Sequence, residues 1–215
     1  MHELNYKSDT CELKNRVPFG TEKRSAQINN AHPPETVASV VHDTQRWIDA
    51  VVVNLNLCPF AKRELDRGSV RFVVCEGDEE ALLHSLQAEL ELLESDAEIE
   101  TTLIIHPNAL TDFPEYNDFL SLAEGLLREL GFDGVVQIAS FHPDYQFAET
   151  SFNDAENYSN RSPYPMLHLL RESSVSRAVE SHPNIDAVPE NNIATLQALG
   201  SPALQELLKG ISGGN

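Results

Sequence analysis

Two histidines follow directly after apolar, β-branched runs in this sequence. His106 follows "TTLII" and His142 follows "IASF", and each precedes a proline. If both runs are neighbouring parallel strands, their carboxyl ends meet at the sheet edge where α/β proteins bind ligands. The two imidazoles could act there as general acids or bases, or bind a divalent metal together with Asp144, although their spacing matches no known metal signature. The alternative is that each histidine starts a turn and bonds a backbone group.

Cys58 is the candidate nucleophile. Pro59 is suited to the first position of a helix over "PFAKREL", which would make Cys58 the N-cap, where the helix dipole and free amides favour a thiolate. Lys62 and Arg63 in the next turn would add to this effect. Cys58 could therefore be a catalytic or redox thiol. The competing interpretation is a small apolar residue that closes the preceding helix.

A polar segment near residue 160 carries the candidate substrate-binding residues. In "ENYSNRSPYPMLHLLRE", Arg161 is a cation in a strongly acidic chain, and its guanidinium could hold a carboxylate or a phosphate. The alternative is an ion pair with Asp154 or Glu156 that orders the segment. The other candidate binding residues, some of which could instead be structural, are Tyr145, Asn157, Asn160, Tyr164, His168 and Arg171.

The composition argues against several classes of function. The chain has 15 Lys and Arg against 34 Asp and Glu, a formal net charge of −19, which repels nucleic-acid phosphates and anionic lipid. We therefore expect a small-molecule ligand, with no nucleic-acid and no membrane partner. The sequence has no glycine-rich signature for NAD or ATP and no lysine between Lys62 and Lys209 to suggest PLP. Three irregularly spaced cysteines and the lack of a signal peptide or a membrane-length apolar run predict a cytoplasmic protein.

Strands and helices alternate in the part of the chain that would position these residues. Strands are predicted over 69–76, 101–107 and 134–143, with helices between them, and Asp78 is the expected N-cap of the first of these helices. This order predicts an α/β fold with a βαβαβ core, that is, a small, mainly parallel sheet flanked by helices. A long polar loop follows at the carboxyl edge of the sheet. "LHLLRE" could be a fourth strand or a helical turn, and a strand inserted between those bearing the histidines would place them about 10 Å apart.

The predicted organisation is a flexible leader over 1–34, a single α/β domain over 35–202 and a C-terminal tail over 203–215. Within the domain, "LNLCPFA", "YNDFL", "QIASFHPDYQFA", "ENYSNRSPYPMLHLLRE" and "NIATLQALG" resemble segments of bacterial and plant proteins catalogued as domain of unknown function 1415. The resemblance spans roughly residues 37–200. It implies that most of the candidate site residues belong to the characteristic segments of that family, and it implies no particular activity or cofactor.

Two hypotheses for the function follow. The first is an enzyme that acts on a small, anionic molecule, with Cys58 as the nucleophile, His106 or His142 as the acid or base, and Arg161 holding the substrate. A divalent metal at the histidines is a variant of this hypothesis. The second is a non-catalytic small-molecule-binding or interaction protein in which the histidines are structural.

Overall fold

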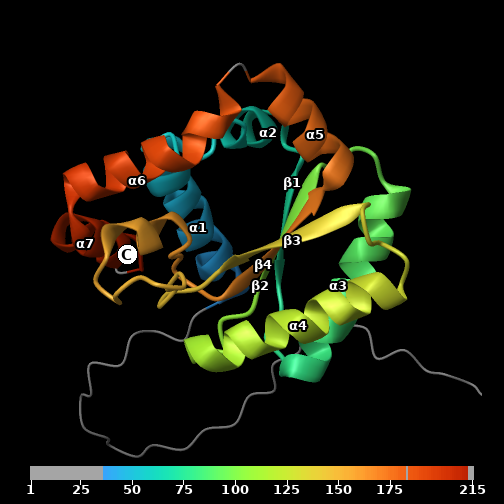
Figure 1. Ribbon diagram of the computed structural model, residues 1–215. Coiled ribbons are helices and arrows are strands. Elements are labelled where there is room, and N and C mark those ends of the chain that lie inside the picture. The colour runs from blue at the N-terminus through green and yellow to red at the C-terminus, as the bar shows by residue number, and fades with distance from the viewer. Residues whose placement is uncertain (1–35, 183, 213–215) are drawn as a thin grey trace, which may run out of the picture. The chain divides into compact units, whose positions relative to one another are not determined.

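Four strands form one mixed sheet in the order β1-β2-β4-β3 (Figure 1). β1 (Val70–Val74) pairs in parallel with β2 (Thr101–Ile105), whereas β4 (Met166–Arg171) runs antiparallel to both β2 and β3 (Val136–Phe141). The computed structural model describes residues 36–182 and 184–212. The predicted leader lies outside these residues.

The expectation of a mainly parallel sheet is wrong because of β4. The segment that could have been a strand or a helical turn is a strand, and it inserts between β2 and β3. Met166, Leu167 and Leu169 are fully buried, so apolar side chains on both faces favour a central position for this strand. β1, β2 and β3 still point the same way, but the ends of β2 and β3 are two strand spacings apart, about 10 Å.

One face of the sheet is covered by α3 (Glu79–Ser95) and α4 (Phe113–Glu129). The leucines at 82, 86, 90 and 93 of α3 are fully buried and pack in a core with Ile104 and Leu169. As predicted, Asp78 caps α3, and its side chain accepts a hydrogen bond from the Ala81 amide at 3.1 Å. Asp112 caps α4 in the same way, through the Glu115 amide.

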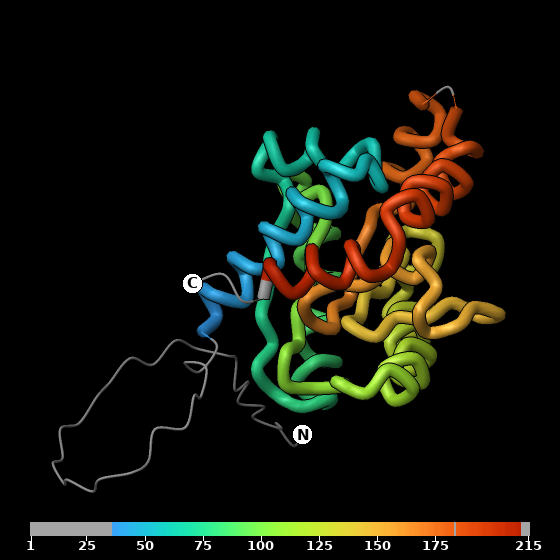
Figure 2. The backbone as a smooth tube through the Cα atoms, turned by 90° about the vertical axis from the view of Figure 1, so that its left-hand side faces the viewer, coloured from blue at the N-terminus to red at the C-terminus, as the bar shows by residue number. Residues whose placement is uncertain are grey.

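The opposite face is covered by α1 (Val37–Trp47), the π-helix η1 (Ile48–Val53), α6 (Val188–Leu199) and α7 (Ser201–Ser212). Figure 2 shows α7 in red, ending beside the blue α1, and Arg46 donates to the carbonyls of Gly210 and Ile211 there. The predicted tail therefore needs correcting: up to Ser212 it continues as helix α7, in which Leu204 and Ile211 are buried.

Short elements complete the compact unit that the described residues form. They are α2 (Ala61–Arg67), α5 (Glu172–Ser181) and the 3-10 turns η2 (Ala155–Ser159) and η3 (Ile185–Ala187). η2 lies within the predicted long polar loop. Across the described residues, no helix combines the length and apolarity that crossing a membrane requires.

Candidate functional site

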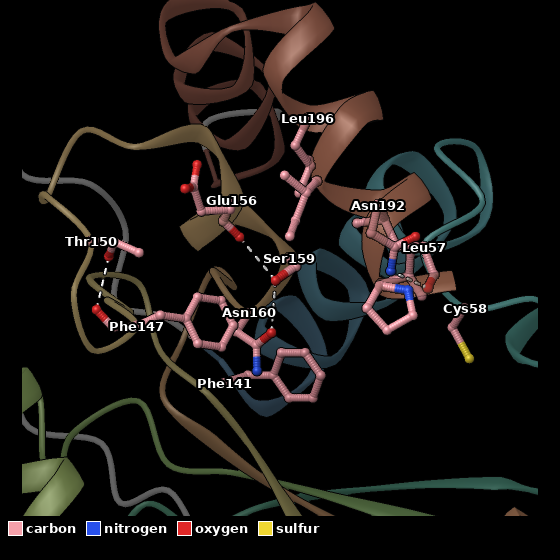
Figure 3. Close-up of a pocket in the computed structure, with 13 residues that line it drawn as sticks. Leu57, Cys58, Phe141, Phe147, Thr150, Glu156, Ser159, Asn160, Asn192 and Leu196 are labelled. Atoms are coloured by element: carbon pink, nitrogen blue, oxygen red, sulfur yellow. Dashed lines mark hydrogen bonds between the residues drawn. The ribbon is translucent and has the colours of Figure 1, made fainter. Parts of the chain in front are cut away.

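A pocket of about 540 Å³ opens on the face of the sheet that η1, η2 and α6 cover. Its walls are mainly apolar, and Figure 3 shows the rings of Phe141 and Phe147 on one side of it, with Leu196 of α6 on another. The polar residues of the lining are Cys58, Thr150, Glu156, Ser159, Asn160 and Asn192.

The π-helix η1 shapes the side of the pocket that carries Cys58. Its wider turns continue into the loop, where the Leu57 amide donates to the carbonyl of Val52, five residues earlier, at 2.9 Å. Asn56 takes a positive φ of 54°, which asparagine tolerates better than most residues. Asn192 of α6 then donates from Nδ2 to the Leu57 carbonyl at 2.8 Å. Single π-helical turns are frequent at functional sites, and this one brings Leu57 and Cys58 to the pocket.

Asn160 holds the η2 side of the pocket against the end of β3. Its Nδ2 donates to the Ser140 carbonyl at 3.0 Å, and its Oδ1 accepts from the Ser159 hydroxyl at 2.9 Å. The backbone carbonyl of Asn160 accepts from the His142 amide at 3.1 Å. These bonds fix the polar loop relative to the sheet.

Cys58 does not occupy the predicted N-cap position. Helix α2 begins at Ala61 with Phe60 as the preceding residue, because Cys58, Pro59 and Phe60 form a turn in which the Cys58 carbonyl accepts from the Ala61 amide. Lys62 is directed to Asp66, at 2.8 Å. Cys58 is a free, partly exposed cysteine of the pocket lining, and Figure 3 shows its sulfur directed away from the other labelled residues.

His106 and His142 are both buried, and both bond to turns of the backbone. The His106 Nδ1 proton points to the Ala109 carbonyl at 2.9 Å. In His142, Nδ1 accepts from the Asp144 amide at 3.0 Å, so Nε2 carries the proton and donates to the Leu110 carbonyl at 3.2 Å. Both rings pack near the ring of Tyr116, with centroid distances of 5.8 Å for His106 and 5.1 Å for His142.

The predicted metal ligands are not arranged around a common point. In the described part of the chain, no group of three or more His, Cys, Asp or Glu side chains is placed to hold a metal ion. Asp144 contributes its backbone amide, not its carboxylate, to His142. His106 retains one unpaired nitrogen, Nε2, which is buried and has no hydrogen-bond partner among the described residues.

Stability should fall in mild acid because of His106. Burial lowers the pKa of His106 to about 4, so between about pH 6.5 and pH 4 the unfolded state binds a proton that the folded state does not. Above pH 6.5 the buried neutral His106 does not reduce the free energy of unfolding. Between pH 7 and pH 5 its reluctance to bind a proton lowers that free energy by about 2 kcal/mol. Urea unfolding at these two pH values measures the loss.

The control for this prediction is His106→Asn, which keeps a donor for the Ala109 carbonyl but does not titrate. The variant should lose about 2 kcal/mol less than the wild type between pH 7 and pH 5. Equal losses in both proteins would show that protonation of His106 is not coupled to unfolding.

The Arg161 guanidinium is buried and its donors are directed to the loop around it. Nε donates to the Tyr145 carbonyl at 3.1 Å and Nη2 to the Phe152 carbonyl at 2.6 Å. The guanidinium also lies over the rings of Phe152 and Tyr158, 4.4 and 4.6 Å from their centroids. Arg161 is absent from the pocket lining, and no ion pair with Asp154 or Glu156 forms in the described residues.

The remaining predicted binding residues also have structural partners. Asn157 bonds the Phe147 amide, the Thr150 hydroxyl and the Ser151 carbonyl within the polar loop. Tyr164 donates to Asp43 at 3.2 Å, and Tyr145 accepts a long bond of 3.5 Å from Ser140. His168 lies mid-strand beside Thr101, and burial lowers its pKa to about 4. Arg171, the last residue of β4, donates to the carbonyls of Leu93 in the last turn of α3 and of Asp96 and Ile99 just after it.

The family follows from a match along most of the chain. A family model described as "Protein of unknown function (DUF1415)" matches residues 39–206. The chain is a member of the DUF1415 family. No curated protein and no solved structure has significant similarity to it.

The pocket is where the segments that resemble the DUF1415 family come together. Ten of its 13 lining residues lie in four of those five segments: Leu57, Cys58, Phe141, Phe147, Glu156, Ser159, Asn160, Asn192, Ile193 and Leu196. These segments lie far apart in sequence: Leu57 and Asn192, which bond each other, are 135 residues apart. Of the predicted site residues, Cys58 and Asn160 are brought together here.

Several residues that line the pocket were not predicted, because the sequence marks them only weakly as site residues. Phe141 and Leu196 match the apolar pattern of a strand and a helix, so their types alone indicate core. Glu156, Ser159 and Asn192 lie in the quoted segments. Membership of these segments was the signal that could have identified them, because nothing in their spacing suggests a shared site.

Proposed function

We propose that this DUF1415 protein binds a small, largely apolar molecule in the pocket between η1, η2 and α6. The observation that carries the proposal is the cavity itself, which residues of η1 and the loop after it, β3, η2 and α6 line together within the span that the family model matches. A volume of about 540 Å³ falls in the range of small-molecule sites, about 300 to 1,000 Å³, and apolar walls with a few polar groups are typical of them.

Binding is supported better than Cys-His catalysis. The lining contains no His, Lys or Arg, so Cys58 has no base beside it in the pocket that could activate the thiol. His142 bonds backbone groups with both ring nitrogens, and His106 does so with Nδ1, while its Nε2 is buried and neither histidine lines the pocket. The second hypothesis from the sequence, a non-catalytic binding protein, is therefore the one we adopt.

The single tryptophan provides a direct readout of occupancy. Trp47 is the only tryptophan in the chain, and its ring packs edge-on against Phe141, 5.2 Å between centroids. Phe141 lines the pocket. A ligand that contacts Phe141 is expected to shift the emission of Trp47, and titration with small apolar compounds then gives a Kd.

A pair of variants on α6 tests whether the emission change arises in the pocket. Ile193 and Leu199 are similarly exposed, 42% and 44%, but only Ile193 lines the pocket. Ile193→Phe should narrow the cavity and weaken binding about fivefold or more, since overpacking costs about 1 to 3 kcal/mol. Leu199→Phe should leave the Kd unchanged. Equal effects of the two substitutions would place the binding elsewhere.

A covalent role for Cys58 is the second candidate function, because this free cysteine is one of the residues that line the same pocket. If Cys58 is only part of the wall, Cys58→Ser binds the same compounds with little change in Kd. If the thiol reacts, a mass increase equal to the bound compound or to part of it appears on the wild type and is absent from Cys58→Ser.

A further inference from the structure

The hydrogen-bonding groups that line the pocket are mainly acceptors. No described residue donates a hydrogen bond or forms an ion pair with the carboxylate of Glu156. Asn192 uses Nδ2 on the Leu57 carbonyl, and its Oδ1 has no hydrogen bond within the described residues. The hydroxyl of Ser159 directs its proton to Glu156 O or Asn160 Oδ1, which leaves its oxygen able to accept.

The charge of the pocket lining is negative, and it therefore also favours a ligand that carries hydrogen-bond donors. Glu156 is its only carboxylate, and no Lys, Arg or His side chain offsets that charge within the lining. The guanidinium of Arg161, one residue from Asn160, is held instead by carbonyls and rings on the loop. A bound anion would meet a carboxylate with no cation beside it, whereas a bound cation would gain a counter-ion.

Aromatic walls add to this preference. Phe141 and Phe147 both line the pocket, and Figure 3 shows their rings on the same side of it, with Asn160 between them and Ser159. The faces of phenylalanine rings attract cations. The net charge of −19 also favours the approach of a positive ligand over a negative one.

We infer that the ligand of this pocket is an amine, protonated and attached to an apolar body, with Glu156 as its counter-ion. The inference rests on the proposed function, because it assigns the chemistry of the molecule that the same pocket binds. Asn192 Oδ1 and the Ser159 hydroxyl oxygen are two further acceptors that the lining offers to the ligand. The sequence analysis expected an anionic substrate held by Arg161, whereas the inferred ligand is a cation.

Three probes that share one ring but differ in charge test the inference: benzylamine, benzyl alcohol and benzoate. Their Kd values are measured near pH 7.5 from the emission of Trp47. We expect benzylamine to bind about tenfold more tightly than benzyl alcohol, the difference that one charge-assisted hydrogen bond supplies, and benzoate to bind most weakly. Glu156→Gln keeps the shape of the side chain and should reduce the preference for the amine to about twofold or less.

The matched control is Glu190→Gln on α6. Glu190 is exposed and adjoins the lining residue Pro189 without lining the pocket itself, so the variant has the same change in net charge and should keep the full preference for the amine. Thermal unfolding of both variants checks that they fold, which we expect because no described residue bonds the Glu156 carboxylate.

The outcomes separate this inference from the function on which it rests. If benzyl alcohol binds in the pocket as tightly as benzylamine, or if Glu156→Gln leaves the preference intact, the amine assignment is overturned and small-molecule binding stands. If none of the three probes changes the emission of Trp47 at millimolar concentration, both are overturned.

Discussion

Replacing Arg161 with methionine is expected to destabilise the protein by about 4 kcal/mol. The substitution removes two charge-assisted hydrogen bonds to the carbonyls of Tyr145 and Phe152 and two cation-π contacts, with Phe152 and Tyr158. Charged hydrogen bonds contribute about 1.5 to 3 kcal/mol each and cation-π contacts about 0.5 to 2 kcal/mol. Methionine fills similar volume, so the loss reflects polar groups and not a cavity. Urea unfolding at pH 7 measures it.

Arg128→Met is the control for Arg161. Arg128 is exposed on α4 and its nearest carboxylate is that of Glu124, at 3.9 Å, an i,i+4 pair of a kind that contributes about 0.3 to 0.5 kcal/mol. The two substitutions therefore remove the same charge with very different expected costs. The prediction is contradicted if Arg161→Met unfolds at the same urea concentration as the wild type. If that variant also fails to bind ligand, Arg161 is a binding residue, as the sequence first suggested, and does not stabilise the fold.

Tyr116→Phe is the second substitution with a large expected effect, about 3 kcal/mol. The Tyr116 hydroxyl donates to the Met166 carbonyl at 2.8 Å and accepts from the Phe141 amide at 3.1 Å. Met166 and Phe141 are partners in the register of β4 and β3, so the hydroxyl bridges the last rung of that pair. Its loss removes both of these hydrogen bonds, and each backbone group that stays unpaired costs about 1 to 3 kcal/mol.

Tyr145→Phe provides the comparison, because its hydroxyl makes one long bond of 3.5 Å, to Ser140, and the same atom is removed. We expect a cost below about 0.5 kcal/mol. Hydrogen exchange adds a local readout, in which the Phe141 amide should lose protection in Tyr116→Phe alone. Similar unfolding midpoints for the two variants would mean that the bridge between β3 and β4 does not stabilise the sheet.

The elements of the fold were largely readable from local patterns. β1, α3, β2, α4 and β3 each carry their own periodicity and end signals, such as Asp78 before α3. The place of β4 was not readable, because a run of apolar residues indicates burial without specifying which strands flank it or in which direction it runs. The C-terminal helix α7 was missed because its packing partner is also distant in sequence. Its apolar residues are buried through contacts with α1, more than 150 positions away.

The candidate site was only partly predictable, because residue type does not show which polar side chains reach the pocket. Cys58 and Asn160 were selected as chemically able residues, and both line the pocket. His106, His142 and Arg161 were selected on the same grounds, but the fold directs most of their polar atoms to backbone groups. Residue type and spacing do not reveal whether a polar atom bonds the chain or a ligand, since that depends on contacts made after folding.

The most direct test of the pocket assignment is the map of backbone amide chemical shifts that change when benzylamine or benzyl alcohol is added to the ¹⁵N-labelled protein. The proposal predicts changes at Cys58, Phe141, Asn160, Asn192 and Leu196, which lie far apart in sequence but line the one pocket. Changes confined to a second pocket, between α3 and α4 around Leu122 and Leu126, or no changes at millimolar probe, would contradict it.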